Sequence, residues 1–130
     1  MQMVVTIAIV AIVSTFGVLG IKNARAEFRW RNSARQLAVY LEKARADSIR
    51  RHATSGNESW VETLSVGANT YNVRMDFGSG ILETRTIQLE SGITFLTTAQ
   101  RTSFDWRGRA TVHSVYQVFN GIDNMSRKRV

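Results

Sequence analysis

The first 21 residues, Met1 to Ile21, carry no charged side chain, and charged residues follow closely from Lys22 onward. With about 1.5 Å of rise per residue, a helix over this run is about 31 Å long, which matches the hydrocarbon core of a bilayer. In lipid, a helix is the only single segment that satisfies its own backbone hydrogen bonds. The sequence therefore predicts a transmembrane anchor over residues 1–21.

Two alternatives compete with this anchor. A helix that is apolar on all sides could be buried in a soluble core, but the rest of a 130-residue chain is small for surrounding it. A cleaved secretory signal would have a basic start and a shorter apolar region that ends at small residues. Met1-Gln2 has no positive side chain, and Ala24-Arg25-Ala26 is a weak match to a cleavage site. The anchor fits the sequence best.

The net charge of +7 is distributed unevenly. Residues 22–51 hold nine basic and three acidic side chains, and the rest of the chain is nearly balanced. The excess positive charge is suited to contact with anionic headgroups and to solvation of a helix face. An anionic polymer as partner is the alternative, and composition alone favours headgroup contact and solvation. The chain has no cysteine, so it forms no disulfide and offers no thiolate to a metal.

Residues 22–55 have the pattern of an amphipathic helix that continues the anchor, because no proline interrupts the chain. We expect the helix to end near Thr54, where Gly56 can adopt the positive φ of a helix terminus. Asp47 is expected on the solvent-exposed faces of this helix, together with Glu42 and Lys43. The predicted buried stripe has helical spacing and consists of Ala34, Leu37, Ala38, Leu41 and Ala44 or Arg45.

Residues 56–130 change to the two-residue period of strands. Glycines separate the predicted strands, which cover residues 60–66, 71–77, 87–90, 93–95, 102–106 and 110–119. Their spacing predicts a small antiparallel meander with one buried face, which the helical stripe would cover. The predicted fold class is therefore α+β, with one long N-terminal helix packed on a small antiparallel β-sheet domain.

Three segments resemble those of one known superfamily. Residues 3–10 (MVVTIAIV) look like the stretch after the processing site of type IV pilin-like proteins. Residues 34–51 (ARQLAVYLEKARADSIRR) and the turn at 104–109 (FDWRGR) resemble the subgroup of H-type pseudopilins and FimT-like minor pilins. The resemblance implies a structural subunit of a type IV pilus or a type II secretion pseudopilus, with other pilin or pseudopilin subunits as partners. Its candidate assembly residues are Val4, Ile7, Val10 and Val13.

The resemblance also implies a place in the cell. Such proteins cross the bacterial inner membrane once and hold their β-domain in the periplasm, whereas the positive-inside rule applied literally to this chain gives the opposite orientation. We expect the orientation of the family. By register, the family's mature N-terminal phenylalanine and its glutamate would lie at or before Met1. We therefore expect a native N-terminal leader, and part of a last strand, outside this chain.

The sequence offers little to catalysis. His52 and His113 are not spaced as metal ligands, and Gly78-Ser79-Gly80 is a turn without a following helix. Asp105 is expected to stabilise a turn with Arg107 and Arg109. We therefore expect neither an enzyme nor a bound metal or cofactor. An unrelated single-pass membrane protein with a small periplasmic β-domain is the alternative.

Basic residues near the C-terminus are the strongest candidates for contact with an anion. FimT-like proteins are associated with DNA uptake and carry a C-terminal arginine motif, to which Ser126-Arg127-Lys128-Arg129 is a partial match. Adjacent cations displace counterions from phosphates and give salt-sensitive binding to duplex DNA. Arg107 and Arg109, beside Trp106 as a stacking surface, are candidates for extending the patch. A solvated strand end is the competing interpretation of this cluster.

Overall fold

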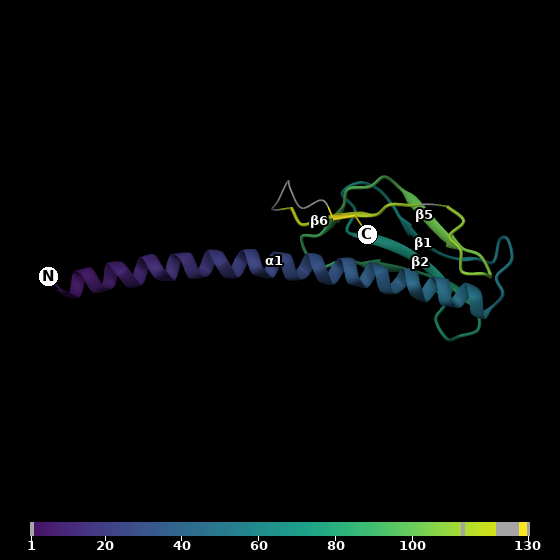
Figure 1. The fold of residues 1–130 in the computed structure, drawn as a ribbon, viewed down its shortest axis with the longest axis horizontal. Coiled ribbons are helices and arrows are strands. Elements are labelled where there is room, and N and C mark those ends of the chain that lie inside the picture. Colours follow the sequence, from purple (N-terminus) through teal and green to yellow (C-terminus); the bar gives the residue numbers. More distant parts are fainter. Residues whose placement is uncertain (1, 113, 122–127, 130) are drawn as a thin grey trace.

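One helix runs through both halves of the N-terminal region. The structure, a computed structural model, describes residues 2–112, 114–121 and 128–129. Of Gln2, Leu19, Lys128 and Arg129 it describes the backbone alone. Helix α1 (Gln2–Arg50) has no break between the apolar and the charged half. At about 1.5 Å per residue it is about 73 Å long. Figure 1 shows the β-domain packed along its C-terminal part, while its N-terminal part projects free of the domain.

Helix α1 ends earlier than expected. It stops at Arg50, and His52, not Gly56, is the first residue after it with a positive φ, of 50°. The Ala53 N–H donates to the Ser48 carbonyl at 2.9 Å, and the His52 N–H donates to the Ile49 carbonyl at 3.1 Å. These two bonds form a Schellman motif, which satisfies the last helical carbonyls. The prediction of an end near Thr54 was wrong because histidine supplies the left-handed residue.

The β-domain contains two antiparallel sheets. The larger has the order β3-β2-β1-β5, formed by β1 (Ser59–Thr63), β2 (Thr70–Asp76), β3 (Leu82–Gln88) and β5 (Gln100–Phe104). The smaller has the order β4-β6-β7, formed by β4 (Thr94–Phe95), β6 (Gln117–Phe119) and β7 (Lys128–Arg129). The α+β fold, with a long N-terminal helix packed on a small antiparallel sheet, is confirmed.

The strand pattern departs from a simple meander at two places. The strands predicted at 87–90 and 93–95 correspond to the end of β3 and to β4, which lie in different sheets, and β5 pairs with β1. Residues 110–119 form a strand only from Gln117 to Phe119. Before it, the Thr111 N–H donates to the Ser103 carbonyl and the Val115 N–H donates to the Gln100 side chain. Thr111 and Val115 therefore pair their N–H groups outside a continuous strand ladder.

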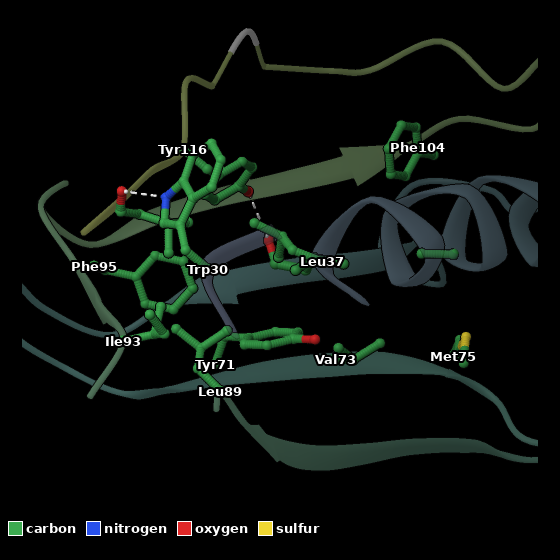
Figure 2. Close-up of a cluster of buried hydrophobic side chains, with 13 residues drawn as sticks. Trp30, Leu37, Tyr71, Val73, Met75, Leu89, Ile93, Phe95, Phe104 and Tyr116 are labelled. Atoms are coloured by element: carbon green, nitrogen blue, oxygen red, sulfur yellow. Dashed lines mark hydrogen bonds between the residues drawn. The ribbon is translucent and has the colours of Figure 1, made fainter. Parts of the chain in front are cut away.

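The core lies between α1 and the inner face of the larger sheet. Leu37 of α1 is fully buried, as are Val61, Tyr71 and Val73 of the sheet. Figure 2 shows Leu37 and Trp30 among the side chains that the strands contribute. The Trp30 Nε1–H donates to the Val118 carbonyl at 3.2 Å, which joins α1 to the smaller sheet. The predicted stripe is confirmed at its centre, and it begins earlier, at Trp30.

Candidate functional site

The apolar half of α1 is the most unusual surface of the molecule. From Met3 to Ile21, every described large apolar side chain is more than half exposed. The Ser14 hydroxyl donates to the Val10 carbonyl at 2.7 Å, and the Thr15 hydroxyl donates to the Ala11 carbonyl at 2.8 Å. The helix thus satisfies these two hydroxyls internally, as a segment in hydrocarbon must. In the described part of the chain, α1 is the one helix long and apolar enough to span a membrane.

The four candidate assembly residues lie on this exposed half. Val4, Ile7, Val10 and Val13 are between 59% and 70% exposed. Because a helix turns about 100° per residue, a spacing of three displaces each side chain by about 60° from the previous one. The four residues therefore wind around α1 and do not form a single face. A helix that uses all of them contacts neighbours on several sides.

Beyond the apolar run, α1 carries three exposed cations before the domain begins. We call Lys22, Arg25 and Arg29 the basic collar. All three side chains are exposed, and none of them forms an ion pair or a hydrogen bond with any described residue. Trp30, immediately after the collar, is the first of the described side chains of α1 that is buried by the domain. The collar thus fills the junction between the apolar run and the domain.

The turn at Asp105–Arg109 forms as expected. The Asp105 carboxylate accepts the N–H groups of Arg107 at 2.9 Å and of Arg109 at 2.7 Å. The bond from the Arg109 N–H is the largest of the effects that hold the pKa of Asp105 below its usual value, and the Arg107 N–H and the Arg109 charge add to it. Gly108, with φ of 75°, packs against Ile49, where an added Cβ would lie 2.7 Å from the Ile49 Cδ1. This close contact fixes the turn at the end of α1 that is far from the apolar run.

Among the predicted DNA-binding residues, Arg107 and Arg109 are not adjacent to the backbone of Lys128 and Arg129. The Arg45 Nε–H donates to the Gly108 carbonyl at 3.0 Å, so Arg107 and Arg109 flank a residue held against Arg45. Lys128 and Arg129, in β7, pair through their backbones with Val118 and Gln117 of β6, near Trp30. Trp30 and Arg45 are about 22 Å apart along the helix axis. Figure 1 shows β6 and the far end of β5 at opposite ends of the domain.

Two candidate residues fall outside the described part of the chain. Arg127 and His113 lie in the residues that the structure does not describe. His52 is exposed and caps the end of α1, which agrees with its interpretation as a solvated residue. In residues 2–112, 114–121 and 128–129, no three His, Cys, Asp or Glu side chains are grouped so that they could hold a metal ion.

A buried carboxylate is the feature that sequence reasoning missed. Asp47 was expected on the wet side of the helix, but its side chain is only 5% exposed. It accepts hydrogen bonds from the Ser59 hydroxyl at 2.6 Å, from Arg50 and Arg51 at 2.9 Å each, and from the Asp76 N–H at 3.1 Å. Asp47 lies in phase with Leu37 and Ala44 of the buried stripe, and that spacing was the signal available in the sequence.

These contacts set the charge state of Asp47. Its burial acts to raise the pKa, but the hydrogen bonds from Ser59, Arg50, the Asp76 N–H and Arg51 together outweigh burial and lower the pKa from 3.8 to about 2. A carboxylate with a lowered pKa stabilises the folded state above its unfolded pKa. That stabilisation is lost as the pH falls from about 4 towards about 2. Asp47 therefore links the end of α1 to the sheet as a charged group.

We expect Asp47→Asn to lower the free energy of unfolding by about 2 kcal/mol at neutral pH, the equivalent of the pKa shift. The difference from the wild type should shrink as the pH falls from 5 to 2. Denaturant unfolding of the detergent-solubilised chain, followed by circular dichroism, measures both quantities. Glu42→Gln is the matched control, because its exposed pair with Arg45 at 3.7 Å contributes little. A difference that stays constant over this pH range would contradict the assigned role.

Comparison of the chain with protein-family models, curated proteins and solved structures finds no match. Function is therefore inferred from the fold and from the chemistry of the residues. What these define is the coarse class: an α+β protein whose long N-terminal helix is apolar enough to span a membrane.

Proposed function

We propose that the chain is a minor pilin or pseudopilin, a structural subunit of a type IV pilus or of a type II secretion pseudopilus. The observation that carries the proposal is α1, a single helix whose first half is exposed and apolar and whose second half supports a compact β-domain. A rod of this kind can pack its apolar half among similar helices while the domain stays in water. The sequence resemblance points to the same architecture.

In this proposal the helix first anchors the subunit in the bacterial inner membrane, with the domain in the periplasm. The exposed apolar side chains then exchange lipid for the helices of neighbouring subunits during assembly. Replacing lipid by neighbouring helices changes the polarity around each side chain little, because lipid tails and packed leucine or valine side chains are similarly apolar. The role is structural and involves no catalytic group.

Single-cysteine cross-linking tests the proposal, because the chain has no cysteine of its own. Cysteine placed singly at Val4, Ile7, Val10 or Val13 should cross-link to other pilin-like subunits in the native host. Since these positions wind around the helix, we expect more than one of them to react. Thr84→Cys, on the exposed part of β3, is the control and should give far less product. If no position on the helix captures a pilin-like subunit, the unrelated single-pass protein becomes the better account.

We further propose DNA capture as an added activity. The observation that favours it is an exposed aromatic–cation pair: Trp106 is 47% exposed, and the Arg107 guanidinium lies 4.5 Å from the centre of its ring. Such a pair offers a stacking surface and a positive charge to a nucleic acid. The C-terminal basic cluster is a second candidate for binding phosphates, and the backbone of its Lys128 and Arg129 lies at the other end of the domain.

Two variants separate these sites. Changing Arg127, Lys128 and Arg129 to glutamine should weaken duplex binding and reduce the salt slope by about 0.9 for each phosphate that is no longer neutralised. Arg107→Gln should act independently, because Arg107 and the backbone of β7 lie at opposite ends of the domain. Fluorescence anisotropy with labelled duplex DNA at several salt concentrations measures both effects. Binding curves identical to the wild type for both variants would remove this activity.

A further inference from the structure

The basic collar is positioned between two different environments. It begins at Lys22, directly after the apolar run, and ends at Arg29, directly before the buried Trp30. Its members are spaced three and four residues apart, so they lie on one face of α1. All three are exposed. The collar is therefore available to whatever surrounds the helix at the level where it leaves the apolar run.

The charge of the collar is not compensated within the described part of the molecule. The nearest acidic side chain in this stretch, Glu27, points to another side of α1 and pairs with Arg31 at 2.8 Å. The collar residues themselves have no acidic partner among the described residues. Three cations without counter-charges on one helical face call for an anionic surface from outside the chain.

The depth of the collar identifies that surface. If the hydrocarbon core ends at Ile21, Lys22, Arg25 and Arg29 lie about 2, 6 and 12 Å beyond it along the axis. The headgroup layer adds about 5–8 Å on each side of the core. Lys22 and Arg25 thus fall within the layer of lipid phosphates, and the long side chain of Arg29 can extend back towards it. Exposed Phe28 adds an apolar side chain beside Arg29 in this region.

We propose that the basic collar binds the headgroup phosphates of anionic phospholipids. The site consists of Lys22, Arg25 and Arg29, and its ligand is a lipid in the bilayer that the helix spans. The backbone of β7 lies near Trp30, so the chain carries Lys128 and Arg129 to the same end of the domain. The proposal needs only the membrane-spanning helix and would hold for any single-pass protein with this stalk, so it does not depend on pilus or pseudopilus assembly.

Lipid binding by the full-length chain tests the proposal. The protein in neutral detergent micelles is titrated with phosphatidylglycerol or phosphatidylcholine, and native mass spectrometry counts the bound lipids. The wild type should bind phosphatidylglycerol in clear preference to phosphatidylcholine. Changing Lys22, Arg25 and Arg29 to glutamine should reduce that preference by about fivefold for each residue at low ionic strength. Circular dichroism confirms that the variant keeps its helix, which exposed substitutions should not disturb.

Two further variants make the result specific. Changing Arg74, Arg85 and Arg101 to glutamine removes the same charge from the sheet, away from the apolar run, and should leave the preference unchanged. Lys22→Arg combined with Arg25→Lys and Arg29→Lys keeps the charge and should retain the lipid. An unchanged preference in the glutamine variant, or an equal loss in the sheet variant, would overturn the proposal.

Discussion

Replacing both Val10 and Val13 by arginine is expected to prevent stable insertion of the chain into a membrane. Both residues lie near the middle of the apolar run and are exposed, at 59% and 65%. An arginine at the centre of a spanning helix costs about 2.5–3.5 kcal/mol on insertion scales, so two of them cost about 6 kcal/mol. This is large enough to move most of the protein out of the membrane fraction.

Alkaline extraction of membranes, followed by quantitation of the protein in pellet and supernatant, measures this effect. Val39→Arg is the matched control, since Val39 is 49% exposed on the same helix but lies beside the domain. The control should stay in the pellet with the wild type. Equal retention of the double variant and the wild type would show that the apolar half of α1 does not lie in hydrocarbon.

Leu37→Ala is expected to have the largest effect on the stability of the β-domain. Leu37 is 0% exposed and belongs to the central cluster shown in Figure 2. Truncation of a fully buried leucine removes its transfer free energy and leaves a cavity, which together cost about 2–5 kcal/mol. A small domain with marginal stability would then be partly unfolded at moderate temperature.

Denaturant unfolding of the full chain in detergent, followed by near-ultraviolet circular dichroism, measures this destabilisation. Tyr71→Phe is the matched control in the same cluster. It keeps the ring but removes a buried hydroxyl that has no hydrogen-bond partner among the described residues. That change should be close to neutral. A destabilisation below about 1 kcal/mol for Leu37→Ala would mean that α1 does not pack on the sheet as described.

The long helix was predictable because its signals are local. The charge-free run, the lack of proline and the helical spacing around Leu37 each follow from the order of residues alone. The alternation in β2 was equally readable, and Tyr71, Val73 and Met75 are buried as the pattern indicates. The end of the helix was not readable, because a histidine adopted the left-handed conformation that glycine usually supplies.

The features that were missed depend on contacts between distant segments. The burial of Asp47 requires Ser59 and Asp76, which reach it only after the sheet has formed. The assignment of β3 and β4 to different sheets depends on the pairing of β4 with β6, which no local pattern in either segment indicates. The separation of Arg107 from β7 likewise follows from topology. Charge patterns along a chain predict candidate binding residues, but not which of them meet.

We expect one continuous helix to leave lipid and enter water near Ile21. Single nitroxide labels on introduced cysteines along residues 4–29, in full-length protein reconstituted into vesicles, test it directly. Accessibility to oxygen should exceed accessibility to a polar nickel reagent up to about residue 21 and then reverse across the collar. High accessibility to the polar reagent along the whole stretch would contradict the account, because the apolar half would then lie in water.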